Sequence, residues 1–160
     1  LVTEAALTGV SNRRALENGM RREWFRCMDQ RRPLSALMID VDNFKIYNDT
    51  HGHLEGDVQL RGIAQRLHQQ HDPQRELLAR YGGEEFALLL PGVHQAEAMR
   101  RAENIRAAIA ASDAGMTVSI GVAGFVPEVQ ADPDSLLRRA DAALYAAKRG
   151  GRNRVEGDAG

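Results

Sequence analysis

The sequence predicts an α+β domain of the ferredoxin-like type, in which helices pack on one face of an antiparallel sheet. Two features of the chain lead to this prediction. After an N-terminal helix, apolar runs and helical spacings alternate in the order β-α-β-β-α-β, and one further helix follows. A glycine pair, Gly82 and Gly83, stands between the second and third strands, as is typical of a hairpin whose turn needs positive φ angles.

The first half of the chain is predicted to hold two helices and one strand. Ser11 is placed to cap a helix over residues 12–28. The apolar run over residues 34–40 predicts a buried strand, and the polar segment 44–53 is expected to be irregular, with a short helical turn at most. Apolar residues then recur at helical spacing, which predicts a helix over residues 54–69.

The second half is predicted to hold three strands and two helices. Short apolar strands are expected over residues 77–79 and 86–90, on either side of the glycine pair. An apolar face at helical spacing predicts a helix over residues 95–111, and β-branched residues predict a strand over 117–123. The last helix is predicted from the apolar spacing over residues 137–147, and it ends before a second glycine pair.

Length and composition indicate a single globular domain. The chain has 160 residues, of which 43% are hydrophobic and 27% are charged, so it can bury a sizeable core. We expect one domain over residues 1–156. The polar residues after Val155 are expected to fray, with residues 157–160 outside the domain.

Charge and cysteine content argue against several classes of partner. A formal net charge of −1 gives no global basic field for nucleic acid or for a membrane surface. The single cysteine, Cys27, excludes an internal disulfide and fits a reducing compartment. No apolar stretch approaches the ~20 residues of a membrane span, and the first residues do not resemble a signal peptide. The sequence does not begin with Met, so we expect it to be a piece of a longer chain.

Acidic side chains stand at the ends of two predicted strands. Asp40 and Asp42 end the first apolar strand, and Glu84 and Glu85 follow the glycine pair. Because the first and third strands pair in the ferredoxin-like topology, Asp40 is expected to meet Glu84 and Glu85. Such an all-oxygen cluster suits a hard cation such as Mg²⁺. The alternatives are that the turn acids are only solvated and that Asp42 caps the following turn.

Asn48 and Asp57 together suit recognition of a guanine base. Guanine presents one acceptor beside two donor groups, and an amide with a carboxylate can match that edge, whereas adenine would leave the carboxylate without donors. The alternative is local: an Asx turn at Asn48 and a helix cap at Asp57.

Basic residues occur near the acids and at the end of the last helix. Lys148 and Arg152 can hold a triphosphate or simply interact favourably with the helix dipole, and position alone leaves both open. Lys45 lies near the acids, but one lysine does not balance three carboxylates. His51 and His53 have no cysteine or third histidine nearby, so a structural role is favoured over a metal site.

Taken together, these motifs resemble the GGDEF family of diguanylate cyclases over almost the whole chain. "GGEEF" is one of the two active forms of the family signature. The matching segments, in the order of the family, are LTGVSNRR (residues 7–14), DVDNFKIYND (40–49), GHLEGD (52–57), RYGGEEF (80–86), VSIGVA (118–123) and AKRGGRN (147–153).

The resemblance implies a polymerase-palm-like fold and the condensation of two GTP into cyclic di-GMP, a bacterial second messenger, with release of two pyrophosphates. It implies Asp40 and Glu84 as metal ligands with the carbonyl of Val41, for Mg²⁺ or Mn²⁺. It implies that Glu85 helps to deprotonate the 3′-hydroxyl. The implied guanine ligands are Asn48 and Asp57, and the implied phosphate ligands are Lys45, Lys148, Arg152 and the backbone N–H groups of Asn43 and Phe44.

The resemblance also implies partners and two departures. Two copies of the domain must face each other, each with one GTP, and a sensor domain is expected upstream of this sequence, with the cyclase facing the cytosol. Ala5 replaces an aspartate that is frequent in the family. The product-inhibition motif Arg-x-x-Asp becomes Pro73 to Glu76, so its primary site is expected to be absent. The alternative function is a catalytically silent domain that binds nucleotide or a partner protein.

Overall fold

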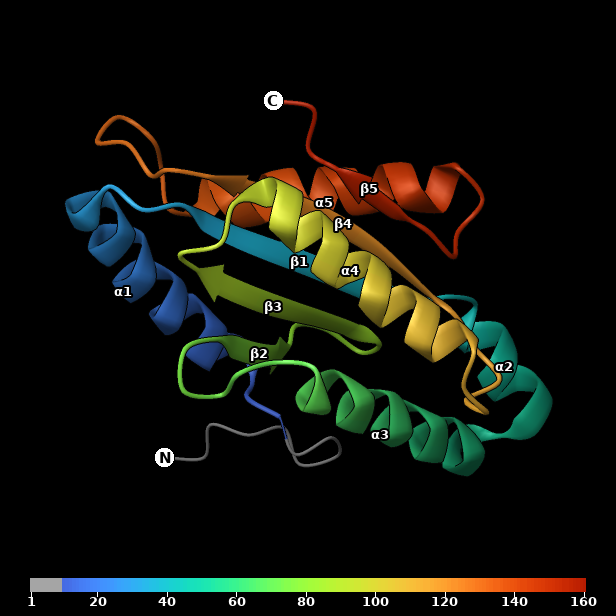
Figure 1. Cartoon of the computed structure of the whole chain (residues 1–160). Coiled ribbons are helices and arrows are strands. Elements are labelled where there is room, and N and C mark those ends of the chain that lie inside the picture. The colour runs from blue at the N-terminus through green and yellow to red at the C-terminus, as the bar shows by residue number, and fades with distance from the viewer. Residues whose placement is uncertain (1–9) are drawn as a thin grey trace.

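A computed structural model describes residues 10–160 and shows a five-stranded sheet with helices around it (Figure 1). The strand order is β2-β3-β1-β4-β5, and all neighbours are antiparallel except β4 and β5. The ferredoxin-like core is thus confirmed, and a parallel fifth strand is added to it. The strands are β1 Leu34–Val41, β2 Leu77–Arg80, β3 Glu85–Pro91, β4 Val118–Phe125 and β5 Val155–Gly157.

Helices cover both faces of the sheet, which corrects the expectation that they pack on one face. In Figure 1, α4 crosses in front of the sheet and α5 lies behind it. The physical reason is that β1 is buried along its whole length, so both of its faces need cover. The helices are α1 Arg13–Gln30, α2 Phe44–His51, α3 His53–Gln69, α4 Gln95–Ala110 and α5 Asp134–Arg149.

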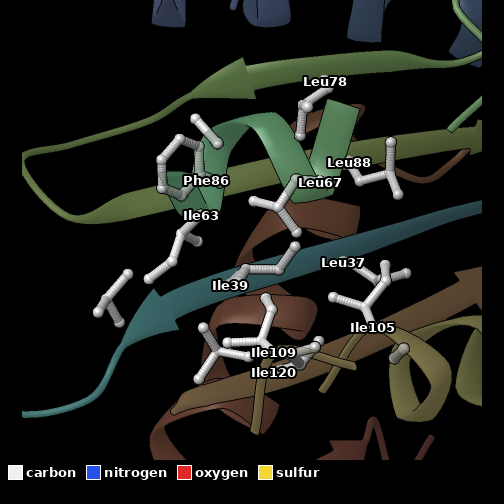
Figure 2. Packing of buried hydrophobic residues seen from close by; sticks show 14 of the residues in the cluster. Leu37, Ile39, Ile63, Leu67, Leu78, Phe86, Leu88, Ile105, Ile109 and Ile120 are labelled. Carbon is white, nitrogen blue, oxygen red and sulfur yellow. The ribbon is translucent and has the colours of Figure 1, made fainter. Parts of the chain in front are cut away.

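Two apolar clusters, one on each face of the sheet, hold these layers together. On one face, Leu37 and Ile39 of β1 belong to the same cluster as Ile63 of α3 and Ile105 of α4 (Figure 2). On the other face, β1 contributes to a second cluster that includes Trp24 of α1 and residues of α5. Burial of such side chains provides most of the favourable free energy of folding.

The register of β1 brings together residues that are far apart in sequence. Asp40 is paired with Glu85 of β3 on one side and with Ser119 of β4 on the other. The N–H of Val41 also donates to the carbonyl of Glu84 at 3.1 Å. The prediction that Asp40 lies near both hairpin acids is therefore confirmed.

Several local predictions were wrong. The segment expected to be irregular forms the helix α2, which buries none of its residues and therefore has no apolar periodicity to reveal it. The N-cap of α1 is Asn12, whose side chain accepts from the N–H of Ala15, rather than Ser11.

Between residues 10 and 160, no helix is both long and apolar enough to cross a membrane.

The expected fraying after Val155 is also wrong for the next three residues. Val155–Gly157 forms β5 against β4. The N–H of Asp158 donates to the carbonyl of Val122 at 2.7 Å, and its carboxylate pairs with Arg139 at 2.5 Å. Backbone pairing and an ion pair, neither visible in the composition, hold this end of the chain.

The close approach of α5 to β4 depends on Gly121. A Cβ atom at this position would lie 2.1 Å from the backbone nitrogen of Leu144 and 2.2 Å from the carbonyl oxygen of Ala140. Backbone atoms cannot move aside as the end of a side chain can. The absence of a side chain at Gly121 therefore sets the distance at which α5 packs on the sheet.

Gly121→Ala is expected to lower the free energy of unfolding by about 3 kcal/mol, because α5 must move away from β4. The measurement is chemical denaturation. Gly62→Ala is the matched control, because its Cβ would meet only the end of the Arg66 side chain, at 3.4 Å. That change within α3 is expected to raise stability by about 0.5–1 kcal/mol. Equal stability of the two variants would contradict the close packing of α5.

Candidate functional site

A cavity of about 230 Å³ opens where β1 ends, α2 begins and the chain leaves α5. It gathers eight of the eleven site residues predicted from the sequence, with Asp42 and Ile46 beside them. Its lining is Asp40, Val41, Asp42, Asn43, Phe44, Lys45, Ile46, Glu84, Lys148 and Arg152. Three predicted residues, Asn48, Asp57 and Glu85, lie outside this lining.

Asp40 is the most deeply placed of the predicted acids, with 5% of its surface exposed. Its Oδ2 forms an ion pair with the ammonium of Lys148, the cation that balances this acid. Its Oδ1 is buried and has no hydrogen-bond partner among residues 10–160. Burial raises the pKa of Asp40, although the hydrogen bond and charge of Lys148 oppose that rise. A buried, unpartnered carboxylate oxygen is costly unless something else binds it.

Glu84 and Glu85 differ in where their carboxylates lie. Burial, and then the negative charge of Asp40, raises the pKa of both residues. Glu84 lines the cavity beside Asp40, whereas Glu85 lines a separate cavity of about 390 Å³ between α1, β1 and α5. The Glu85 carboxylate lies against Gly82, because a Cβ there would be 2.7 Å from Oε1 of Glu85.

The expected cluster of three carboxylates is therefore corrected to two. Within the described residues, no three His, Cys, Asp or Glu side chains are grouped so as to hold a metal ion. Glu85 stands apart because its carboxylate is turned toward Gly82. Asp40 and Glu84 remain as a pair that lines one cavity with Val41, the last residue of β1.

The hairpin turn is held by Arg80 rather than by positive φ angles. The guanidinium of Arg80 donates to the carbonyls of Gly82 at 3.1 Å and Gly83 at 2.6 Å. Neither glycine has a positive φ, so the expected reason for the glycine pair is wrong. Gly82 leaves space for the Glu85 carboxylate, which would have to shift if a Cβ were present 2.7 Å from its Oε1.

The two predicted base ligands lie on neighbouring helices, Asn48 on α2 and Asp57 on α3. The side-chain oxygen of Asn48 is buried and has no hydrogen-bond partner among the described residues. A Cβ at Gly56 would lie 1.6 Å from this oxygen, so only glycine at that position leaves room for the Asn48 amide. Asp57, the residue after Gly56 in α3, is half-buried.

Asp42 has a structural environment that the sequence did not reveal. The alternative that Asp42 caps the following turn is wrong, because α2 has Asn43 as its N-cap residue and no side-chain cap. The Asp42 carboxylate instead accepts hydrogen bonds from β4 and from the loop after α5. Two hydroxyl residues, Thr117 just before β4 and Ser119 within it, are a signal that could have suggested this.

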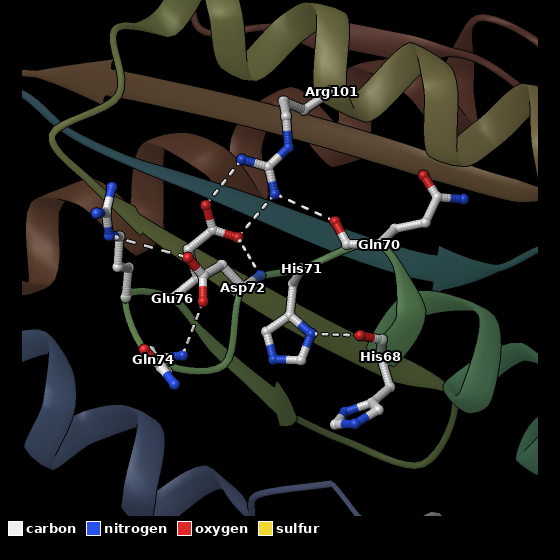
Figure 3. Close-up of polar contacts among 8 residues, drawn as sticks. His68, Gln70, His71, Asp72, Gln74, Glu76 and Arg101 are labelled. Carbon is white, nitrogen blue, oxygen red and sulfur yellow. Dashed lines mark hydrogen bonds and ion pairs between the residues drawn. The ribbon is translucent and has the colours of Figure 1, made fainter.

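In the segment that replaces the Arg-x-x-Asp motif, residues 73–76, the carboxylate of Glu76 forms an ion pair with Arg101 (Figure 3). Arg101 of α4 donates to both carboxylate oxygens of Glu76, at 2.7 and 2.8 Å. Arg101 also donates to the carbonyl of Gln70 at 3.2 Å, and the N–H of Asp72 donates to Glu76 at 3.0 Å. Burial alone would raise the pKa of Glu76, but these hydrogen bonds outweigh it and lower that pKa.

Comparison with solved structures identifies the class of this fold. The GGDEF domain of DgcB from Caulobacter crescentus, solved in complex with c-di-GMP, matches with a TM-score of 0.92 and 35% sequence identity. The match covers 99% of this chain and 94% of that one. The chain belongs to the diguanylate cyclase GGDEF domain family, whose sequence model matches residues 5–154.

Two curated relatives show how much of a longer protein the chain represents. The response regulator PleD of Caulobacter vibrioides is 41% identical over 162 residues, which cover 96% of this chain and 35% of PleD. The diguanylate cyclase DosC of Escherichia coli K12 is 40% identical over 158 residues, which cover 94% of this chain and 34% of DosC. The chain thus spans about a third of the length of these relatives.

Arg101→Met is expected to lower the free energy of unfolding at pH 7 by about 2 kcal/mol, because it leaves the Glu76 carboxylate buried without its guanidinium. Since the folded-state pKa of Glu76 lies below its ordinary value of 4.5, this stabilisation is complete above that value. It is lost as the pH falls through the folded-state pKa. Denaturation at pH 7 and near pH 3 measures the difference between wild type and variant.

Arg100→Met is the matched control, because Arg100 pairs with Glu97 at the exposed surface of α4. It is expected to change stability by less than about 0.5 kcal/mol at either pH. A loss for Arg101→Met that is the same at both pH values would contradict the ion-pair explanation.

Proposed function

We propose that this domain is a metal-dependent diguanylate cyclase that condenses two GTP into cyclic di-GMP and releases two pyrophosphates. The observation that carries the proposal is that Oδ1 of Asp40 has no hydrogen-bond partner within the described part of the chain, while Asp40 lines a cavity together with Glu84, Lys148 and Arg152. This combination of acids and cations suits a metal ion and the phosphates of a nucleotide. Membership of the family supports the same reaction.

Asp40 and Glu84, with the carbonyl of Val41, are the residues that would hold Mg²⁺ or Mn²⁺. All three lie on the lining of one cavity and offer oxygen, the ligand atom that these ions prefer. When bound, the ion would stabilise the negative charge that develops on the triphosphate during transfer. Lys148 neutralises Asp40 in the structure described, and its ammonium is available to a phosphate once the acid has another partner.

The phosphates would be bound by Lys45, Lys148 and Arg152 and by the start of α2. The first turn of α2 has no side-chain cap, so its N–H groups are available to an anion. Asn43 precedes the helix with a φ of 57°, in the left-handed region. Asn43 and Phe44, whose N–H groups would bind phosphate, line the same cavity as the three cations.

Guanine would be bound between α2 and α3 by Asn48 and Asp57. The buried oxygen of Asn48 lacks a partner among residues 10–160 and needs a donor, such as those on the Watson–Crick edge of guanine. Adenine would leave the carboxylate of Asp57 without donors, so GTP is favoured over ATP.

Glu85 would accept a proton from the 3′-hydroxyl that attacks. Its raised pKa makes it a stronger base than an ordinary glutamate. Each domain binds one GTP, so two copies must face each other for either 3′-hydroxyl to reach the α-phosphate of the other GTP. Each attack forms one phosphodiester bond and releases one pyrophosphate.

Control would come from outside this sequence. We infer a sensor segment elsewhere in the same polypeptide, because the chain spans only about a third of its curated relatives. We also propose that the domain faces the cytosol. Tight product binding at the segment around residues 73–76 is not expected. Pro73 has no side-chain donor, and the Glu76 carboxylate is already occupied by Arg101.

The test is incubation of the domain with GTP and Mg²⁺, with the product identified by mass spectrometry. Asp40→Asn and Glu84→Gln are expected to lower turnover at least about 100-fold, since hard-cation binding needs their charge. Glu85→Gln is expected to lower turnover while GTP affinity stays near that of wild type. Activity per milligram is expected to rise with protein concentration as long as the domain is mostly monomeric.

Asp49→Asn is a matched control, because Asp49 is an exposed acid on α2 that does not line the cavity. Its turnover is expected to equal that of wild type. A wild-type domain that binds GTP but forms no cyclic di-GMP at any concentration would favour the silent, nucleotide-binding alternative.

A further inference from the structure

The carboxylate of Asp42 receives three hydrogen bonds from two other segments of the chain. Its Oδ2 accepts from the hydroxyl of Thr117 at 2.7 Å and from the backbone N–H of Asn153 at 3.0 Å. Its Oδ1 accepts from the hydroxyl of Ser119 at 2.6 Å. Only 6% of the residue is exposed. One buried carboxylate therefore joins the end of β1, the start of β4 and the loop between α5 and β5.

The loop between α5 and β5 has an unusual backbone. Gly151, Arg152 and Asn153 have φ angles of 123°, 65° and 46°, three positive values in succession. Residues other than glycine rarely adopt such angles, so the surroundings must hold them there. Two contacts do so at Asn153: its N–H donates to Asp42, and its side-chain oxygen accepts from Arg106 at 2.8 Å.

Asp42 differs from Asp40 in how its oxygens are used. Both oxygens of Asp42 have donors, whereas Oδ1 of Asp40 has none among the described residues. A carboxylate whose oxygens are already occupied is a poor candidate for a metal ligand. Asp42 therefore acts on the site through the chain segments that it holds together.

We propose that Asp42 is a positioning residue for triphosphate binding, because it holds the backbone of Asn153 and thereby the guanidinium of Arg152 at the cavity. Arg152 lines that cavity and immediately precedes the tethered N–H. The inference rests on the proposed function, in which Arg152 is a phosphate ligand. Without the tether, the loop would relax from its positive φ angles and Arg152 would lose its fixed place.

The test compares two probes that differ only in the triphosphate. Guanosine 5′-(α,β-methylene)triphosphate cannot be cleaved at the bond that the reaction breaks, and guanosine carries no phosphate. Asp42→Ala is expected to weaken binding of the triphosphate about tenfold, the effect of losing one charge-assisted contact, and to leave guanosine binding unchanged. Titration calorimetry or NMR measures both affinities, and thermal unfolding checks the fold.

A double-mutant cycle separates this inference from the proposed function. Arg152→Ala alone is expected to weaken triphosphate binding about tenfold, and adding Asp42→Ala should cause no further loss. Asp158→Ala is the matched control, because its carboxylate is also largely buried but pairs with Arg139 and does not line the cavity, and it should bind like wild type. Where Asp42→Ala does not fold, Asp42→Asn serves, and a weakening in the same direction is expected.

The outcomes that overturn the inference are distinct. If Arg152→Ala has no effect, Arg152 is no phosphate ligand and the proposal fails together with that part of the proposed function. If Arg152→Ala weakens binding but Asp42→Ala does not, only the positioning role fails. If Asp42→Ala weakens guanosine as much as the triphosphate, or adds its full effect to Arg152→Ala, the role of Asp42 is general stability and not the position of Arg152.

Discussion

A central strand that is buried on both faces and ends in acids constrains the rest of this structure. β1 buries all eight of its residues, yet Asp40 lies within it and Asp42 comes directly after it. Carboxylates in such a place need cations or hydrogen-bond donors. Lys148 provides the cation for Asp40, while two hydroxyls and one N–H serve Asp42. The partners of these two acids come from α5, from the start of β4 and from the α5–β5 loop. These three segments therefore lie at the same end of β1, where the cavity opens.

The hairpin between β2 and β3 forms the other side of the site, and hydrogen bonds to backbone carbonyls hold it there. Arg80 binds the carbonyls of the glycine pair, and the backbone of Glu84 is bonded to Val41. The backbone hydrogen bond between Val41 and Glu84 thus holds Glu84 at the cavity. Gly82 leaves space for the Glu85 carboxylate outside that cavity. Two adjacent glutamates can then take different roles because their carboxylates lie in different cavities. The negative charge of Asp40 still raises the pKa of both glutamates, and that of Glu84 raises the pKa of Glu85.

Much of the fold could be predicted from the sequence, because it depends on patterns that a sequence records. Apolar periodicity located the long helices and the strands, and strand order then placed Asp40 beside the hairpin acids. The predictions failed where no such pattern exists. α2 buries nothing, β5 is held by backbone pairing, and the helices cover both faces because β1 needs cover on both. In the site, the ion pair of Lys148 with Asp40 and the direction of the Glu85 carboxylate depend on the rotation of α5 and on one rotamer, and neither has a sequence signature.

The central claim is that the cavity at the end of β1 binds the metal and the triphosphate through Asp40 and Glu84. Anomalous diffraction from crystals of the domain grown with Mn²⁺ and guanosine 5′-(α,β-methylene)triphosphate tests it most directly. The account predicts manganese bound by Oδ1 of Asp40 and by the Glu84 carboxylate, with the phosphates against the start of α2. It would be contradicted by manganese on Glu85 without Asp40. It would also be contradicted by a nucleotide seated in a third cavity, also of about 390 Å³, which is lined by Tyr47 and His51 of α2 and not by Glu85.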